Sequence, residues 1–369
     1  MSAFDLELVK LRKVYPGGTV AVEDFDLQVK KGEFITFVGP SGCGKTTTLR
    51  MIAGLESITD GNLLIRGRDY THVPTEQRPT ATIFQNYAIF PHMTVRENIS
   101  FGLNVRKFAP REVDRKVDAI LAKLELEDVA DKKEGALSGG QKQRLALGRG
   151  LVTEPDILLL DEPLGALDAN LRKSIQEELK ILQRELGITF IFVTHAQSEA
   201  LSMGDRVVVM NVGRVEQISD PFELYSRPKS PFVARFIGRN KIIDGILRGW
   251  DGDSCILETR FGALRGVPGF NPGTVPSGAK AMAVVPSEYV NIYAAGSTPG
   301  DEALDTLRGT VTALDRVGQV VHVSVQMDDT LEVRLEVHRD KISGRHVGPG
   351  SEVDLTWRPD RTTIVLDVA

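Results

Sequence analysis

The segment Gly39–Thr46 reads Gly-Pro-Ser-Gly-Cys-Gly-Lys-Thr and combines the residue types that bind a chain of phosphates. Its glycines let the backbone turn so tightly that several N–H groups point at one anion. Lys45 would reach the terminal phosphates, and the hydroxyl of Thr46 would ligate Mg²⁺. The candidate nucleotide-binding residues in this loop are Gly39, Pro40, Ser41, Gly42, Cys43, Gly44, Lys45, Thr46 and Thr47.

Two adjacent carboxylates follow the apolar run Ile157–Leu160. Asp161 ends this run, and its carboxylate is predicted to hold Mg²⁺ through water. Glu162 comes next and is placed to polarise an attacking water as a general base, an effect worth about 10²–10⁴-fold in rate. Together with the phosphate-binding loop, this pair predicts hydrolysis of a nucleoside triphosphate.

Three further side chains are candidates only because they occur together with the phosphate-binding loop and the two carboxylates. His195 closes the apolar run Ile188–Thr194, where a neutral imidazole would touch the terminal phosphate. The amide of Gln85 can bond both the attacking water and Mg²⁺. Tyr15 precedes a Pro-Gly-Gly turn and would stack on adenine, which contributes about 0.5–1.5 kcal/mol. Each of the three also has an ordinary structural explanation, so the sequence favours them as a set.

The chain must bring these groups to one edge of a sheet. Up to about residue 237, short apolar runs alternate with helical stripes, which is typical of a sheet with helices on its faces. Runs such as Phe34–Val38 suit strands buried on both sides. A leucine-rich stripe ending at Gly187 predicts one long helix, and residues 86 to about 135 are predicted to form a helical insert. This α/β fold would be a P-loop NTPase.

The pattern of apolar residues changes after the proline-containing segment 226–231. Long helical stripes disappear, and glycine and proline separate short alternating runs such as Val320–Val325. This pattern predicts a small all-β domain of barrel type. The sequence therefore divides into an ATP-binding domain, residues 1–237, and a β-rich domain, residues 238–369.

Composition limits the classes of function. The 369 residues have a formal charge of −5, so there is no basic excess to favour nucleic acid as a partner. We find neither a signal-peptide pattern nor an apolar run close to the roughly 18 residues that span a bilayer. The two cysteines give no disulfide framework. These features predict a cytosolic protein.

A second glycine-rich segment, Ser138-Gly139-Gly140-Gln141, opens a predicted helix, and a helix start also suits an anion. Taken alone, it could be a simple helix cap. The motifs that occur in order along the chain are Tyr15, GPSGCGKTT (39–47), Gln85, LSGGQKQR (137–144), ILLLDEP (157–163), GALD (165–168) and His195. This set resembles the ATP-binding subunit of an ABC (ATP-binding cassette) importer, and the LSGGQ element is highly specific for that superfamily.

The resemblance implies why there are two anion-binding segments. In this family two cassettes pair head to tail, so that LSGGQ of one chain caps the ATP held by the P-loop of the other. Ser138, Gly139, Gly140 and Gln141 would then bind nucleotide in trans, and Asp168 would lie between the two sites. The resemblance further implies ATP and Mg²⁺ as cofactors and a second ATP-binding subunit, expected to be an identical copy.

It also implies partners at the membrane. These are integral permease subunits and, indirectly, a solute-binding protein, with this chain attached peripherally to the cytoplasmic face of a bacterial cell membrane. Tyr87, Ile89 and Phe90 lie next to Gln85, and we predict that they form part of a groove for a permease helix. A buried loop before a helix would explain them equally simply.

The branch of the family is indicated by the β-rich domain, which resembles the TOBE type and is used by relatives for dimer contact and regulation. A short join at residues 236–245 favours importers of polyamines, ferric iron and related solutes over sugar importers, which stay the alternative. Outside transport, the alternative is a soluble cassette protein or regulator. Three residues depart from the family pattern, namely Gly150, Ala196 and Val285.

Overall fold

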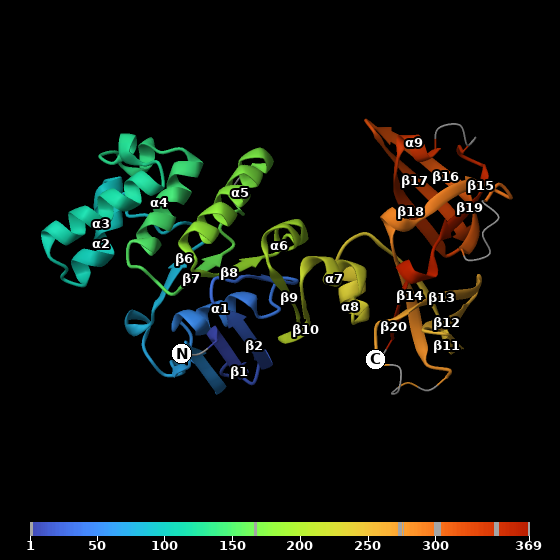
Figure 1. Cartoon of the computed structure of the whole chain (residues 1–369), viewed down its shortest axis with the longest axis horizontal. Coiled ribbons are helices and arrows are strands. Elements are labelled where there is room, and N and C mark those ends of the chain that lie inside the picture. Colours follow the sequence, from blue (N-terminus) through green and yellow to red (C-terminus); the bar gives the residue numbers. More distant parts are fainter. Residues whose placement is uncertain are drawn as a thin grey trace. The chain divides into compact units, whose positions relative to one another are not determined.

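The computed structural model describes residues 3–165, 168–271, 275, 277–298, 304–342 and 347–367. Contacts divide the chain into two compact units, Met1–Pro221 and Phe222–Ala369. The sequence-based boundary falls later, after residue 237, and assigning the intervening segment to the ATP-binding domain stays a prediction. Figure 1 labels the elements of both units.

The first unit is built on a six-stranded sheet with the strand order β10-β9-β3-β8-β7-β6. The strands β9, β3, β8, β7 and β6 run parallel, and β10 pairs antiparallel with β9 at one edge. The strands are β3 (Phe34–Val38), β6 (Thr80–Ile83), β7 (Ile157–Asp161), β8 (Thr189–Thr194), β9 (Arg206–Asn211) and β10 (Arg214–Ser219). The three apolar runs that the sequence analysis names in this part of the chain, Phe34–Val38, Ile157–Leu160 and Ile188–Thr194, thus all correspond to strands of one sheet.

Both faces of this sheet are buried, and successive side chains serve different cores. In β7, Ile157 and Leu159 belong to one apolar cluster and Leu158 and Leu160 to the other. This follows from the two-residue repeat of a strand, and it explains why a parallel strand covered on both sides is apolar throughout.

Helices lie on one side of the sheet, some over its face and others towards its β6 edge, as Figure 1 shows. They are α2 (Val95–Val105), α3 (Pro110–Lys123), α4 (Gly139–Leu151), α5 (Ala169–Leu186) and α6 (Gln197–Met203). The predicted long helix is α5, and it ends at Gly187, which adopts the left-handed conformation with φ 62°. Short 3₁₀ turns occupy Thr75–Gln77, Glu127–Val129 and Glu134–Ala136.

The other face packs on α1 (Lys45–Ala53) and on a second, antiparallel sheet with the order β2-β1-β4-β5. In Figure 1, α1 lies between the two sheets. The strands of this sheet are β1 (Phe4–Val14), β2 (Val20–Lys30), β4 (Asp60–Ile65) and β5 (Arg68–Asp69). The helix that follows the glycine-rich loop is therefore fixed from two sides.

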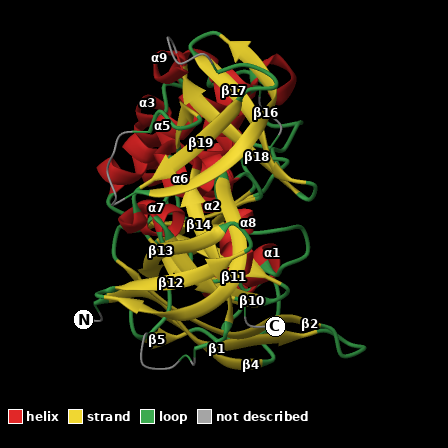
Figure 2. Cartoon of the chain, turned by 90° about the vertical axis from the view of Figure 1, so that its right-hand side faces the viewer, coloured by secondary structure: helices red, strands yellow, loops and turns green. Residues whose placement is uncertain are grey.

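The second unit consists mainly of strands, as Figure 2 makes plain. Five strands close into a barrel in the order β11-β12-β13-β20-β14, and five more form a sheet in the order β15-β19-β16-β17-β18. The barrel strands are β11 (Asn240–Asp251), β12 (Ser254–Thr259), β13 (Gly262–Pro268), β14 (Lys280–Pro286) and β20 (Thr363–Leu366). The sheet strands are β15 (Asn291–Ala294), β16 (Asp305–Val317), β17 (Val320–Asp328), β18 (Leu331–His338) and β19 (Glu352–Trp357).

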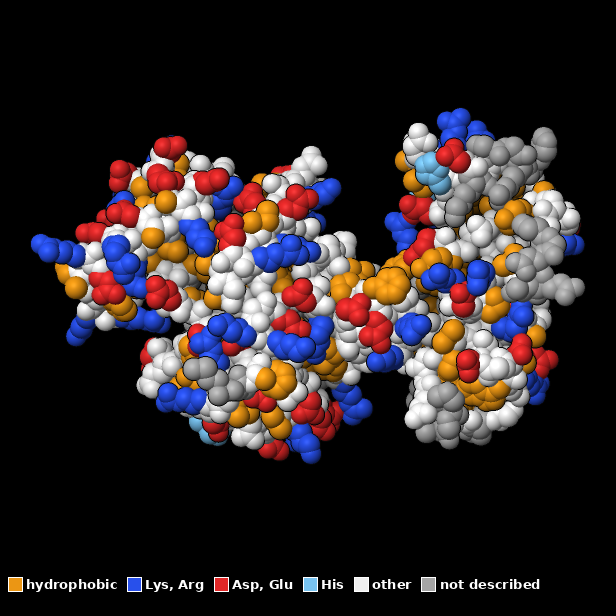
Figure 3. All heavy atoms as spheres, in the orientation of Figure 1, with side chains coloured by type: hydrophobic (Ala, Val, Ile, Leu, Met, Phe, Trp, Pro, Cys, Tyr) orange, Lys and Arg blue, Asp and Glu red, His pale blue; other side chains and the backbone are white. Residues whose placement is uncertain are grey.

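The remaining elements are the short helices α7 (Pro221–Ser226), α8 (Pro231–Phe236) and α9 (Arg339–Ile342) and the 3₁₀ turns Ser287–Tyr289 and Pro359–Arg361. Acidic and basic side chains are interspersed on the face drawn in Figure 3. Within the described residues, no helix combines the length and the apolar character needed to cross a bilayer.

Candidate nucleotide-binding and hydrolysis site

The glycine-rich loop joins β3 to α1, and the buried side chain of Lys45 binds carbonyl groups of the loop. Only 5% of Lys45 is exposed, and its ammonium donates hydrogen bonds to the carbonyls of Gly39 at 2.7 Å and Pro40 at 2.9 Å. Gly44 has φ 103°, and a Cβ there would lie 2.4 Å from the carbonyl oxygen of Ala21. Glycine is therefore required at this point, and the loop is held in a closed ring before α1 begins.

The other loop residues differ in exposure. Ser41 and Gly42 are exposed, Thr47 is half-buried, and Cys43 is only 3% exposed. The Sγ of Cys43 lies 3.6 Å from the ammonium of Lys45. The hydroxyl and backbone groups at the tip are thus accessible, whereas the thiol packs beneath them.

Thr46 and Asp161 meet where β3 and β7 end. The Thr46 hydroxyl donates to Oδ1 of Asp161 at 3.2 Å, although 115 residues separate the two in sequence. Burial raises the pKa of Asp161, and the hydrogen bond from Thr46 opposes this rise. A hydroxyl and a carboxylate are hard oxygen donors of the type that Mg²⁺ binds together with phosphates and water, so the pair fits the ion.

Glu162 follows in an unusual backbone conformation. Its φ of 47° lies in the left-handed region, and its N–H donates to the carbonyl of Val193 on the neighbouring strand at 3.0 Å. This turn directs Oε2 of Glu162 to within 3.2 Å of Nδ1 of His195. The imidazole itself is 62% exposed. The two residues that the sequence named as base and phosphate contact are therefore direct neighbours.

Gln85 follows β6, and its side chain is exposed. A Cβ built on Gly165 would lie 3.4 Å from Nε2 of Gln85, so the amide packs against the loop that follows Glu162. The hydroxyl of Tyr87 donates to the carbonyl of Pro163 at 3.4 Å. The segments after β6 and β7 are thus joined directly beside the carboxylates.

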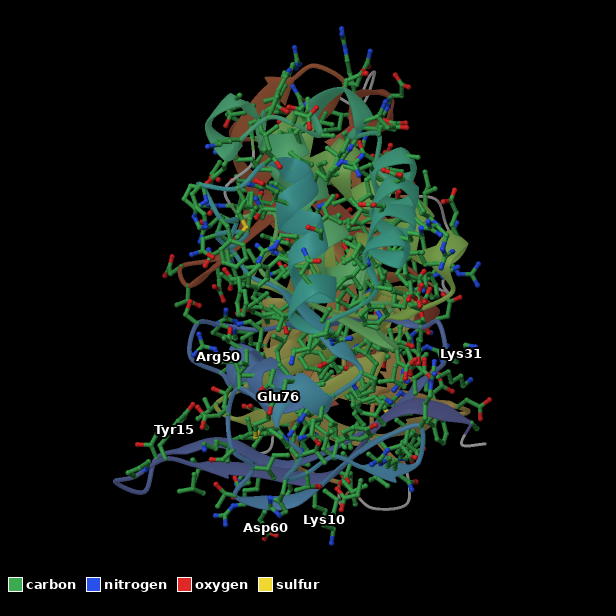
Figure 4. The ribbon with its side chains drawn as sticks, turned by 90° about the vertical axis from the view of Figure 1, so that its left-hand side faces the viewer. Lys10, Tyr15, Lys31, Arg50, Asp60 and Glu76 are labelled. Atoms are coloured by element: carbon green, nitrogen blue, oxygen red, sulfur yellow. The ribbon has the colours of Figure 1, made fainter. Side chains whose placement is uncertain are left out.

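Tyr15 lies where β1 turns towards β2. Its hydroxyl donates to Glu56 at 3.2 Å, and the ammonium of Lys13 lies 5.1 Å from its ring centroid. Lys13 in turn forms an ion pair with Glu56 at 2.7 Å. Figure 4 shows Tyr15 on the same side of the unit as Arg50, which belongs to α1. The aromatic ring is consequently held in position near the helix that follows the loop.

The segment Ser138–Gln141 forms the start of α4 and is satisfied by its own atoms. The Ser138 side chain accepts from the N–H of Gln141 at 3.3 Å, and Oε1 of Gln141 accepts from the N–H of Ser138 at 2.9 Å. Ser138 and Gly139 are exposed, and Gly140 is half-buried. In the described part of the chain, these groups make no hydrogen bond to the glycine-rich loop.

Asp168 has a similar local role at the start of α5. Its carboxylate accepts from the N–H groups of Asn170 at 3.1 Å and Leu171 at 3.0 Å. Ala166 and Leu167, the middle residues of the GALD motif, lie outside the described residues. The structure thus brings together Lys45, Thr46, Asp161, Glu162, His195 and Gln85 in one region, and leaves Ser138 and Asp168 as the caps of separate helices.

Comparison with known proteins identifies this arrangement. The profile of the ABC transporter family matches residues 22–165, and that of the TOBE domain matches residues 286–365. A relative from Thermobifida fusca, named spermidine/putrescine import ATP-binding protein PotA, is 41% identical over 98% of this chain and 93% of its own length. The chain belongs to the ABC transporter family. The TOBE match confirms the type predicted for the C-terminal β-rich domain.

Further comparisons agree with this ABC protein. A relative of the same name from Acidothermus cellulolyticus is 43% identical over 96% of this chain and 92% of its own length. A solved ATP-binding cassette, described as a dimer in a post-hydrolysis state with ADP and Pi, has a TM-score of 0.52 and 31% identity. It covers 58% of this chain and 98% of its own. This chain is accordingly an importer ATPase.

Two contacts of the ABC unit were not foreseen from the sequence. Asn98 is 1% exposed, and its side chain bonds both the N–H and the C=O of Phe90, at 2.9 and 3.1 Å. The guanidinium of Arg149 donates to the carbonyl of Ala88 and lies 4.4 Å from the ring centroid of Phe90. A polar residue within the apolar stripe of α2 is the signal that would have found Asn98.

These contacts shape a cavity of about 240 Å³ between β6, α2 and α4. Tyr87 and Phe101 line it, and Phe101 is 38% exposed. Ile89 and Phe90 are partly buried, and Phe90 packs on Phe101 with ring centroids 4.7 Å apart. Tyr87 thus borders an open hollow, and Phe90 contacts one of the other lining residues, Phe101.

The three departures from the family pattern have identifiable surroundings. Ala196 is the N-cap of α6 and offers no side-chain acceptor, but its N–H donates to the hydroxyl of Thr194 at 3.0 Å. A Cβ on Gly150 would lie 3.2 Å from methyl groups of Ile83 and Leu158, so the helix packs tightly there. Val285 is completely buried in the β-rich unit.

Proposed function

We propose that this chain is the ATPase of a polyamine importer, working as a homodimer that closes around Mg²⁺-ATP. The observation that supports the cargo is the name shared by the two relatives, which match nearly the whole chain at 41% and 43% identity. The solutes of that branch, spermidine and putrescine, are cations of similar chemistry. Sugar import is the second candidate within the family.

The P-loop half of the site would bind the triphosphate. Its backbone N–H groups and Lys45 neutralise the phosphates, and Tyr15 stacks on the adenine ring. Thr46 and Asp161 would hold Mg²⁺, with Gln85 as a further ligand, and the ion would neutralise charge that develops on the phosphates. This assignment is supported by the 3.2 Å contact between the Thr46 hydroxyl and the Asp161 carboxylate.

Hydrolysis would depend on two neighbouring side chains. Glu162 accepts a proton from the attacking water, and His195 contacts the terminal phosphate and orients the carboxylate. Their separation of 3.2 Å supports a joint role. Gln85 is placed to align the same water from the opposite loop.

The other half of the site would act on the partner copy's nucleotide. Ser138, Gly139, Gly140 and Gln141 are exposed or half-buried at a helix start, where N–H groups and helix polarity favour an anion. Asp168 would lie between the two nucleotides and respond to both. The similar cassette solved as a dimer with ADP and Pi supports the pairing of two copies.

The membrane partner would be an integral permease, with this chain bound peripherally on the cytoplasmic face and a solute-binding protein acting on the far side. We assign the hollow lined by Tyr87 and Phe101 to a permease helix, because it is open, presents these two aromatic side chains and lies near Gln85. The β-rich unit would serve dimer contact or regulation, as the TOBE match suggests.

Uptake in cells tests the cargo. Deleting the gene should abolish energy-dependent uptake of labelled spermidine, and the wild-type chain, but not Glu162→Gln, should restore it. Uptake of labelled maltose in the same cells is the matched control. Spermidine uptake that survives deletion would reject the polyamine assignment, and a loss of maltose uptake instead would favour the sugar importer.

A second variant tests the permease contact. Phe101→Glu should leave ATP binding by the isolated chain unchanged and prevent restoration of uptake, because a carboxylate would be buried against an apolar helix. Val212→Glu is the control, since Val212 is 80% exposed and lies away from this cavity. Normal uptake with Phe101→Glu would show that the permease binds elsewhere.

A further inference from the structure

A buried acid that the proposed hydrolysis does not use lies four residues after His195. Glu199 belongs to α6 and is 5% exposed, and its Oε2 accepts a hydrogen bond from the hydroxyl of Thr194 at 2.5 Å. Thr194 is the last residue of β8 and is 2% exposed. A glutamate is rarely buried so deeply unless it is paired, because removing its charge from water is costly. The hydrogen bond to Thr194 therefore belongs to the reason why an acid stands at this position.

The Thr194 hydroxyl connects this acid to the backbone on both sides of His195. It donates to Glu199 and accepts a hydrogen bond from the N–H of Ala196 at 3.0 Å. The chain is thus closed into a tight turn with His195 at its centre. The imidazole is 62% exposed, and its Nδ1 lies 3.2 Å from Oε2 of Glu162. Because so much of this ring is in solvent, its direction depends on the turn from which it projects.

The start of α6 shows how Glu199 comes to hold this turn. In a capping box, the glutamate at the third helical position accepts a hydrogen bond from the N–H of the N-cap residue. Glu199 is the third residue of α6, and the N-cap is Ala196, which has no side-chain acceptor. Here the hydroxyl of Thr194 accepts from the N-cap N–H, and Glu199 binds that hydroxyl. The cap of α6 and the turn at His195 therefore depend on the same two side chains.

A second contact of Glu199 joins the turn to α5. Oε1 of Glu199 lies 3.7 Å from Nε of Arg172, and Figure 1 shows α6 beside α5. Arg172 lies near the start of α5, which begins at the cap formed by Asp168. The same two helices meet again near the end of α6, where the ammonium of Lys180 donates to the carbonyl of Ser202 at 2.8 Å. Of these two contacts, only the first includes the acid that binds Thr194.

We propose that Glu199, acting through Thr194, is a positioning residue that holds His195 beside the terminal phosphate. This role presupposes the contact between His195 and that phosphate proposed above. The two buried side chains would restrict the imidazole before ATP binds, and a reaction is faster when a contributing group is already in place. Arg172 would make the same position depend on α5, and hence on Asp168 at the proposed interface between two copies.

The main test compares single-turnover hydrolysis with nucleotide binding by the full chain. Thr194→Val keeps the shape of the side chain and removes the hydroxyl, so hydrolysis of Mg²⁺-ATP should slow by about tenfold or more. The affinity for Mg²⁺-ADP should stay as in the wild type, because ADP lacks the phosphate that His195 is expected to contact. Thr194→Ser retains the hydroxyl and should hydrolyse ATP at a rate close to that of the wild type.

A second pair of variants addresses the acid itself. Glu199→Gln keeps an acceptor for the Thr194 hydroxyl and should retain most of the rate, whereas Glu199→Ala should slow hydrolysis by about tenfold or more. Lys180→Met is the matched control, since it removes the other contact between α5 and α6 and should leave the rate unchanged.

A change of background separates positioning from a general loss of structure. In His195→Ala, adding Thr194→Val or Glu199→Ala should slow hydrolysis no further, because the side chain that they position is absent. The proposal is overturned if these substitutions slow His195→Ala as much as the wild type, or if both leave the wild-type rate unchanged. A full rate in His195→Ala alone would instead reject the contact proposed for His195, and this inference with it.

Arg172→Gln tests the link to α5. It should slow hydrolysis by less than Glu199→Ala does, and it should add nothing to the effect of Glu199→Ala in the double variant, because both act through the same carboxylate. An unchanged rate in Arg172→Gln would retain the role of Glu199 and reject its link to α5.

Discussion

The two glycine-rich segments that we propose to bind phosphate are stabilised in opposite ways. The P-loop side is a convergence of distant residues, in which Lys45 is buried and Thr46 contacts Asp161 from 115 positions away. The Ser138 side is entirely local, because Ser138 and Gln141 satisfy each other within one helical turn. The first is held by long-range contacts and the second is an exposed helix start, a difference that suits the proposed sharing of the site between two copies.

The largest expected effect distinguishes the P-loop half of the proposed site from its Ser138 half. Glu162→Gln should lower hydrolysis by about 10²–10⁴-fold and, with Mg²⁺-ATP, form a stable dimer on size exclusion, because the bridging nucleotide is no longer cleaved. Adding Ser138→Glu should abolish the dimer while leaving ATP binding intact, since only the exposed half is changed. A Glu162→Gln chain that stays monomeric at saturating Mg²⁺-ATP would refute the shared site.

A smaller effect concerns the P-loop half and its buried acid. Burial raises the pKa of Asp161, so this carboxylate is protonated at a higher pH than an exposed aspartate. Mg²⁺-dependent ATP affinity should therefore fall as the pH is lowered from about 7 towards 4, by more than the titration of ATP alone explains.

Asp161→Asn is the control for that experiment. It should bind Mg²⁺-ATP weakly at every pH, so the difference between the two curves isolates the carboxylate. Because the charged form is disfavoured in the folded chain, Asp161→Asn should also raise the free energy of unfolding at neutral pH. Equal pH dependence in both proteins would assign the titration to another group.

The smallest expected effect compares two helix starts. Ser138 caps α4 with its side chain, whereas Ala196 begins α6, beside His195, without a side-chain cap. Ala196→Asp should stabilise the unit by about 1 kcal/mol, and Ser138→Ala should destabilise it by a similar amount. Thermal unfolding measures both, and Ala196→Asn separates the cap from the added charge. A lower melting temperature for both Ala196 variants would contradict this account.

The sequence predicted what depends on local pattern. The P-loop and the three buried strand runs could be read directly, because each follows a fixed spacing or an unbroken apolar stretch. Gly187 was likewise identifiable as the end of α5. These elements already imply that Asp161 and the P-loop lie at one edge, since parallel strands end on the same side.

Contacts between remote side chains could not be predicted in this way. Glu56 holds Tyr15, and Asn98 holds the segment around Phe90, only because turns and helices between them set the distance. The second antiparallel sheet was missed because its pairings join β1 to β4 across an intervening α/β segment. The buried amide of Gln143 on α4 has no hydrogen-bond partner among the described residues, and it too could not be predicted, since burial depends on the neighbouring helices.

The left-handed backbone at Glu162 has a consequence for how this protein could change over generations. A non-glycine residue there is strained by about 1–3 kcal/mol, and glycine would relieve the strain while removing the carboxylate. With the catalytic role proposed for Glu162, selection for stability alone would thus favour chains that have lost activity. In a descendant that no longer hydrolyses ATP, we expect Glu162 to be replaced by glycine or asparagine before residues of the P-loop are replaced.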